Sequence, residues 1–339
     1  MSEMVNKVRI SGFLRENNLN IAAHNGVGVI RGNVVVTVEE TGFTPVDIRV
    51  DYYATAGTKA YDGLVKMLPT TAMSYSAIKS MYPTMSDAEI KAKATKVDVL
   101  GSLEENMFKG RDGSVVTAPR IKGFGLFAKE GDFVPYENIT ATAYVETIGE
   151  ETDKDGAPTG RYVLNVCVPN CFTKRDGTAV KDGFKFKLVC VDPVAPYLAT
   201  YCPVGSTLPF IARIVTHEKN TAPVATAAPV VGVNNNLAPT VSVVQEIEII
   251  GVSVNPMDYT ETNGYDPADV RDMLASRALR MEAIEKNDSV APTRNPAAPS
   301  LPTRATPVAS SLGAGLAGNP TPAPAAPATT LNGMSDLVF

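Results

Sequence analysis

Tryptophan is absent from the 339 residues, and histidine occurs only twice. Neither histidine has an evident carboxylate partner, which argues against a histidine-dependent catalytic triad or a His-rich metal site. The four cysteines include no CxxC pair, so buried free thiols are expected instead of zinc or redox chemistry. No set of paired carboxylates suggests general acid and base catalysis. We therefore expect a protein that is not an enzyme and that needs no cofactor or metal.

Long apolar segments are also missing. No run approaches the roughly 20 residues that a membrane helix needs. The first residues, MSEMVNKVRI, carry charge where a signal peptide has its apolar segment. The sequence therefore predicts a cytoplasmic protein without membrane contact.

The net charge of −5 gives no direct support for binding a polyanion, but the basic residues are unevenly distributed. Local charge matters more than the sum for steering a charged ligand. Two stretches, 107–131 and 170–187, are basic on an otherwise acidic background. Their cations are Lys109, Arg111, Arg120, Lys122 and Lys129 in the first stretch, and Lys174, Arg175, Lys181, Lys185 and Lys187 in the second.

Period-2 alternation and turn residues predict a mainly β protein with a repeated order of elements. The first half has strand patterns at 7–14, 27–40, 45–55, 96–108 and 116–129, with a short helix at 60–68. The second half has them at 138–148, 160–170, 183–191, 206–218 and 241–254, with a short helix at 194–202. Three strands, a helix and two strands is the order of a five-stranded Greek-key barrel. We therefore predict tandem OB-folds over residues 1–134 and 135–256.

Insertions and the C-terminal part complete the predicted layout. A helical insertion is expected near 69–94, where SDAE at Ser86 has the form of a capping box. A long Ala/Pro/Asn-rich loop at 219–239 separates the last two strands of the second barrel. Residues 265–286 predict a helix that begins at Pro267. We expect this helix to dock on the barrels in preference to contacting a partner protein. A disordered Pro/Ala-rich linker, 287–330, then leads to the apolar tip LNGMSDLVF, 331–339.

The stretch FKFKLVCVDPVAPYLATYCPVGSTLPFIARI resembles the middle of bacterial and phage single-stranded DNA-binding proteins. The matching residues are the strand Phe184 to Lys187, Tyr197 and Leu198 of the helix, and the turn at Val204, Gly205 and Ser206. In the first half, NKVRISGFL and VDVLGSLEENMFKGRDG look like the opening strand and the fourth strand with its loop. Unlike this chain, the family usually carries one OB-fold per chain, forms tetramers and has several carboxylates in its tip.

The resemblance implies sequence-independent binding and protection of single-stranded DNA in replication, recombination or repair. It also implies recruitment of replication or repair proteins by the tip residues Asp336, Leu337, Val338 and Phe339. A short apolar peptide on a flexible linker is a form that a partner's pocket can bind. An unimportant frayed end remains the alternative, because Asp336 is the tip's one carboxylate. A homo-oligomer is possible.

Binding a single strand needs cations for the phosphates and flat rings on which bases stack. Tyr52 and Tyr53 are adjacent on a strand and must face opposite sides, so one of them is free to stack. Phe184 and Phe186 share one strand face and Lys185 and Lys187 share the other, so the phenylalanines either stack on bases or belong to the core. The candidate contacts are Arg49, Tyr52, Tyr53, Phe108, Lys109, Arg111, Lys122, Lys174, Arg175, Phe184, Lys185, Phe186 and Lys187.

Two other functions remain open from the sequence. OB-folds also serve as protein-binding modules, so a phage structural or assembly protein is the first alternative. The acidic net charge and the lack of tryptophan suit that alternative. RNA binding is the second, and the 2′-hydroxyl would distinguish RNA from DNA.

Overall fold

The computed structural model describes residues 5–110, 112–153, 155–173, 177–219, 242–252, 254–258 and 264–286. These residues belong to one compact unit, and they are mainly β, as predicted. The boundary predicted near residue 134 falls between two strands of this unit. Most of the predicted 219–239 loop, the linker and the tip lie outside the described residues.

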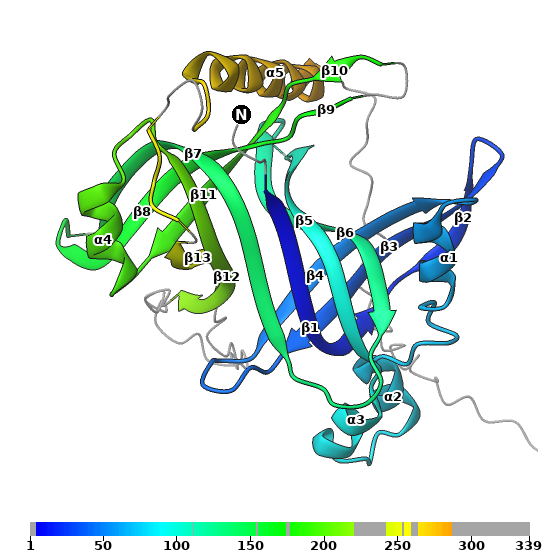
Figure 1. Ribbon diagram of the computed structural model, residues 1–339. Helices are drawn as coiled ribbons and strands as arrows, with labels where there is room; N and C mark the ends of the chain where they lie inside the picture. Colours follow the sequence, from blue (N-terminus) through cyan, green and yellow to red (C-terminus); the bar gives the residue numbers. More distant parts are fainter. Residues whose placement is uncertain are drawn as a thin grey trace, which may run out of the picture. The chain divides into compact units, whose positions relative to one another are not determined.

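The first half of the chain closes a ring of five strands. These strands are β1 (Asn6–Asn17), β3 (Val27–Val38), β4 (Val46–Thr55), β5 (Lys96–Lys109) and β6 (Val115–Ala128). The ring runs β1, β3, β4, β6, β5 and back to β1, and only the β4–β6 pair is parallel. A short strand missed in the sequence, β2 (Asn20–His24), extends the sheet as a hairpin with β3. Helix α1 (Lys59–Val65) follows β4 and begins the connection to β5 (Figure 1).

The second half repeats this pairing. Its ring consists of β7 (Tyr136–Thr152), β8 (Pro158–Pro169), β11 (Gly183–Cys190), β13 (Ser242–Val252) and β12 (Thr207–Lys219), in this spatial order. Helix α4 (Val194–Tyr201) follows the third strand, and a small ribbon, β9 (Phe172–Thr173) with β10 (Ala179–Val180), lies in the β8–β11 connection. β1 also pairs with β7, so both rings share one continuous sheet. The repeated strand order agrees with the predicted order of elements, and the assignment of each ring as an OB-fold stays a prediction.

Strand β4 shows how alternation builds the core. Val46, Ile48, Val50, Tyr52 and Ala54 point inward and are buried. The Tyr52 ring occupies the space beside Gly123, where an added Cβ would lie 2.2 Å from the ring. Its hydroxyl donates to the Gly125 carbonyl at 3.1 Å, and burial raises the pKa of this phenol. Three of the four cysteines are likewise buried free thiols, as predicted.

The insertion between α1 and β5 covers part of β1. It contains α2 (Tyr75–Met81), which the sequence did not reveal, and α3 (Asp87–Lys93), which begins at the predicted capping box of Ser86 and Glu89. Tyr75, Ile78 and Ile90 pack with Phe13 on the outer face of β1. This apolar contact explains why Phe13 is buried although it points away from the barrel interior.

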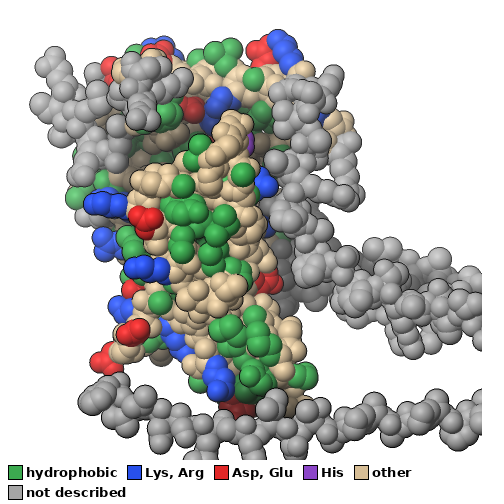
Figure 2. Space-filling view, turned by 90° about the vertical axis from the view of Figure 1, so that its right-hand side faces the viewer, with side chains coloured by type: hydrophobic (Ala, Val, Ile, Leu, Met, Phe, Trp, Pro, Cys, Tyr) green, Lys and Arg blue, Asp and Glu red, His purple; other side chains and the backbone are tan. Residues whose placement is uncertain are grey.

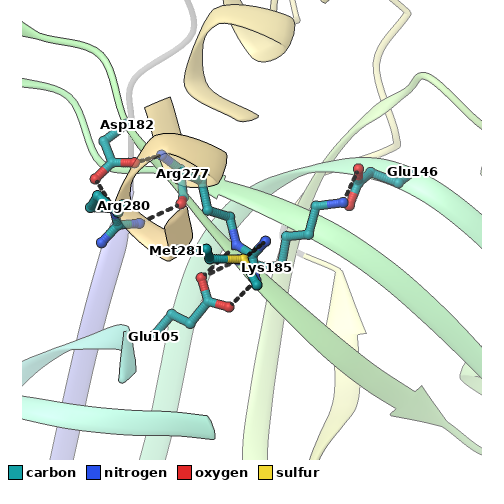
Figure 3. A network of polar contacts seen from close by, with 8 residues as sticks. Glu105, Glu146, Asp182, Lys185, Arg277, Arg280 and Met281 are labelled. Atoms are coloured by element: carbon teal, nitrogen blue, oxygen red, sulfur yellow. Dashed lines mark hydrogen bonds and ion pairs between the residues drawn. The ribbon is translucent and has the colours of Figure 1, made fainter. Parts of the chain in front are cut away.

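Helix α5 (Pro267–Lys286) docks on both barrels, and the preference for docking is confirmed (Figure 1). Its buried side chains include Val270 and Met273. Arg277 donates from Nε to the Glu105 carboxylate of β5 at 2.8 Å. Arg280 pairs with Asp182, just before β11, at 3.0 Å (Figure 3). The backbone N–H of Lys185 also donates to Glu105, at 3.3 Å, so one buried carboxylate joins β5, β11 and α5.

Candidate nucleic-acid interface

The outer face of the first barrel carries two exposed aromatic rings on neighbouring strands. Tyr53 on β4 and Phe124 on β6 directly follow the parallel pair Tyr52–Gly123. Tyr53 is 54% exposed and Phe124 is 57% exposed. Because both residues directly follow the last pair of this ladder, they lie on neighbouring strands, which are about 4.8 Å apart.

A β-bulge in β6 includes Phe124. Leu100 of β5 pairs with Gly125, and the next residue, Gly101, pairs with Gly123, which leaves Phe124 as the extra residue on β6. Bulges often redirect a side chain at functional places in a sheet. The extra residue lets Ile121 and Leu126, on either side of the bulge, both lie buried, while Phe124 between them is exposed.

Two arginines extend this line across the strands. Arg31 of β3 lies opposite Tyr53, and Arg9 of β1 lies opposite Leu100. Both arginine side chains are exposed. Since side chains alternate along each strand, these residues share the outer face of the barrel. We call the following set the transverse row: Arg31, Tyr53, Phe124, Leu100 and Arg9.

The transverse row contains no carboxylate. Within the part of the chain that the structure describes, neither Arg31 nor Arg9 forms an ion pair. The nearest carboxylates on these strands are paired with other cations. Asp51, next to Tyr53 on the outer face of β4, pairs with Arg49 at 3.0 Å, and Asp98, next to Leu100 on β5, pairs with Lys129 at 3.2 Å. Glu104, further along β5, pairs with Lys122 at 3.2 Å. The row therefore offers two arginines to an anionic ligand without a competing acidic side chain.

Further apolar surface lies beside the row. Phe127 of β6 is 50% exposed, and its ring lies over Gly125, where an added Cβ would meet it at 2.7 Å. Ile21 and Val27 are exposed on the β2–β3 hairpin. Figure 2 views the side of the molecule that carries this hairpin and α1, and shows hydrophobic side chains in groups with Lys and Arg beside them.

Three predicted contacts lie on this face and are exposed: Arg49, Tyr53 and Lys122. Tyr53 is the tyrosine that is free to stack, and it belongs to the transverse row. Arg49 and Lys122 flank the row, each paired with a carboxylate. Whether they contact nucleic acid stays a prediction.

The structure corrects the expectation for three aromatic residues. Tyr52, Phe184 and Phe186 point into the barrels and are buried. The rings of Phe184 and Phe186 lie 6.3 Å apart, and the Arg280 guanidinium lies 5.6 Å from the Phe184 ring. These rings pack in the core because they occupy the inward positions of their strands, so they offer no stacking surface.

The remaining described candidates lie away from the row. Phe108 is partly exposed at the end of β5, and Lys109 donates from Nζ to the Glu285 carbonyl of α5 at 3.0 Å. Lys185 and Lys187 face outward on β11 but pair with Glu146 at 2.9 Å and Glu151 at 3.6 Å. Arg111, Lys174, Arg175 and the tip residues 336–339 lie outside the described residues.

Sequence reasoning missed Arg31, Phe124 and Arg9. One available signal was the segment Gly123-Phe124-Gly125, since glycines inside a strand often mark a bulge. The arginines gave no such signal, because only the strand register brings Arg31 and Arg9 into line with the rings.

Other kinds of site find no support in the described residues. No three His, Cys, Asp or Glu side chains there come together in a way that could hold a metal ion. No helix in the described ranges is both long and apolar enough to span a membrane.

Comparison with known proteins places the chain in a family. Residues 4–289 match the YorF family. The chain belongs to the YorF family. A search of curated sequences finds no significant match.

Two solved structures that resemble this chain are of the single-stranded DNA-binding protein from Thermus aquaticus. A deletion mutant has 12% identity and a TM-score of 0.45, over 78% of this chain and 100% of that chain. The wild-type protein has 11% identity and a TM-score of 0.43, over 78% and 98%. Similarity at this level does not reveal a ligand, so the function is argued from the site.

Proposed function

We propose that this chain binds single-stranded DNA, without sequence preference, across the transverse row of the first barrel. The observation that carries the proposal is the row itself: two exposed rings on neighbouring strands, with an arginine on either side that forms no ion pair with the described residues. Sequence-independent binders of single strands combine the same two elements, stacking rings and cations.

Each part of the row has a distinct role. Bases stack on Tyr53 and Phe124, whose faces are open to solvent. Phosphates contact Arg31 and Arg9, which are free of carboxylate partners in the described part of the chain. From β3 to β1 the row crosses four inter-strand spacings, about 19 Å. That length accommodates a few nucleotides, within the 4 to 16 or so that one OB-fold covers.

The broader role that we propose is coating of exposed single strands during replication or recombination. The tip residues Asp336 to Phe339 would then recruit a protein partner. Deleting the last six residues should leave oligo-dT affinity unchanged and abolish capture of that partner. Loss of both activities together would contradict a separate role for the tip.

Titration of labelled oligo-dT with the purified chain, at low and at moderate salt, tests the binding. Tyr53→Ala and Phe124→Ala should each weaken binding by about 1–3 kcal/mol, the contribution of one stacked base. Phe172→Ala is the matched control, because Phe172 is an exposed ring on β9 of the second half.

No micromolar binding at low salt would refute the proposal and favour the alternative of a structural or assembly protein. Equal effects of Phe172→Ala and Phe124→Ala would refute the assigned site. A matched oligo-U competitor separates RNA from DNA, since DNA binding predicts that oligo-dT competes better.

A further inference from the structure

The second barrel contains a counterpart for every position of the bulge region. On β12 and β13, Ile211 pairs with Gly251 and Ala212 pairs with Ile249, which leaves Ile250 as the extra residue. In the first barrel, Leu100 pairs with Gly125 and Gly101 pairs with Gly123, which leaves Phe124 as the extra residue. Ile250 is therefore the counterpart of Phe124.

The parallel strand pairs extend this correspondence. Three pairs join β11 to β13, as three join β4 to β6, and the last of these are Cys190–Ile249 and Tyr52–Gly123. Val191, which follows Cys190, is thus the counterpart of Tyr53. Neither Val191 nor Ile250 has a ring. Within the described parts of β8, β11 and β13, no aromatic side chain is exposed as Tyr53 and Phe124 are.

Charge differs between the barrels in the same way. Cys190 pairs with Tyr162, so Arg161 is the counterpart of Arg31. Arg161 forms ion pairs with Glu151, at 3.4 Å, and with Glu246, whereas Arg31 forms none with the described residues.

Carboxylates neutralise the rest of this face. Lys185 and Lys187 pair with Glu146 and Glu151. Glu248 stands at the position of Lys122, in the middle pair of the parallel ladder, and it pairs with Arg213 at 3.2 Å. Among the described residues, the second barrel thus keeps the backbone geometry of the site but has no exposed rings at these positions, and its counterpart of Arg31 is paired with carboxylates.

We infer that the first barrel alone holds the single strand and that the second barrel supports it. This inference rests on the proposed function and specifies which half of the molecule carries it. The second barrel supports the first through direct contacts: β1 pairs with β7, and the buried Glu105 contacts both β11 and α5. One chain therefore covers a segment of single-stranded DNA no longer than one barrel can bind.

Matched double variants test this division. Tyr53→Ala with Phe124→Ala should weaken oligo-dT binding at least tenfold, since each stacked base contributes roughly 5- to 150-fold. The counterpart pair, Val191→Ala with Ile250→Ala, should change it less than about twofold. Thermal melts of both pairs, compared with the wild-type chain, exclude unfolding as the cause of a loss.

Equal losses in the two pairs would overturn the division while leaving DNA binding intact. Absence of binding by the wild-type chain would instead overturn the proposed function, and the inference with it. The two failures are therefore distinguishable.

Oligomer length gives a second readout that needs no variant. The affinity of a single chain for oligo-dT should stop rising within about 16 nucleotides, the upper site size for one OB-fold. A continued rise to about twice that length would show that both barrels hold the strand, because the second contact would then add to the first.

Discussion

Stability of the protein should fall as the pH rises through neutrality, because of one buried carboxyl group. Glu137 of β7 is 9% exposed and lines a cavity of about 330 Å³ between the β3–β4 turn and β12. Burial raises the pKa of Glu137 to about 8, against the opposing effects of the Ile214 N–H, which donates to it at 2.7 Å, and of Arg213. The nearby Glu40 adds to the rise.

The sign and size of the effect follow from proton linkage. Below the ordinary pKa of 4.5 for Glu137, both the folded and unfolded chains hold the proton. Between 4.5 and about 8 only the folded chain holds it, so the free energy of unfolding decreases as the pH rises, and it levels off above 8. One pKa unit corresponds to about 1.36 kcal/mol, which gives a loss of up to about 5 kcal/mol across this window.

Denaturant unfolding of the wild-type chain and of Glu137→Gln, from about pH 5 to about pH 9, measures this loss. Glutamine keeps an acceptor for the Ile214 N–H and does not ionise, so the variant should lack the slope and become the more stable protein at high pH. Glu150→Gln, at an exposed position of the same strand, is the control. Parallel stability curves for wild type and Glu137→Gln would refute the reasoning.

Three further changes test other parts of the structure. Arg277→Ala leaves the Glu105 carboxylate buried without its partner and should cost about 3–5 kcal/mol, measured by denaturant unfolding. Gly123→Ala forces a methyl group against the Tyr52 ring and should cost about 1–3 kcal/mol in the same assay. Arg31→Ala should reduce the slope of log affinity against log salt by about 0.7, since one phosphate contact with a single strand is lost.

Controls for these changes lie close by. Arg271→Ala, on the exposed side of α5, should change stability by less than about 0.5 kcal/mol. Gly149 has open space around it, so Gly149→Ala should also be mild. A cost at Gly123 no larger than at Gly149, or at Arg277 no larger than at Arg271, would contradict the packing described here. An unchanged salt slope for Arg31→Ala would remove Arg31 from the site.

Much of the secondary structure could be predicted because local patterns determine it. The alternation at 183–191 predicted a strand that the structure places at Gly183–Cys190. The capping box at Ser86 marked the start of α3 correctly. Helix α2 was missed because it has Ser74 as N-cap but Ala77 where the capping box of α3 has Glu89, so that sequence signal is absent. Strand β2 was missed because it has only five residues. Short elements leave too few periodic positions to recognise.

The candidate site could be predicted only in part, because its residues come from separate strands. Alternation showed that Tyr52 and Tyr53 face opposite sides but not which of them faces water. That choice depends on Gly123, some 70 residues later, which leaves room for the Tyr52 ring in the core. Arg31 and Arg9 join the site only through strand register, which pairs residues that are distant in the sequence.

Clustering along the sequence is an unreliable guide to a cationic surface in a β protein. The lysines of 170–187 suggested a phosphate-binding stretch, yet Lys185 and Lys187 pair with carboxylates of β7 that precede them by more than 30 residues. Arg31 and Arg9, isolated in the sequence, form no ion pair with any carboxylate in the described part of the chain. Screening at physiological salt limits the reach of exposed charges to about 8 Å, so the carboxylates elsewhere on the surface weigh less than those in contact. A chain with a net charge of −5 can therefore still bind a polyanion, provided that its carboxylates are excluded from the row that the phosphates touch.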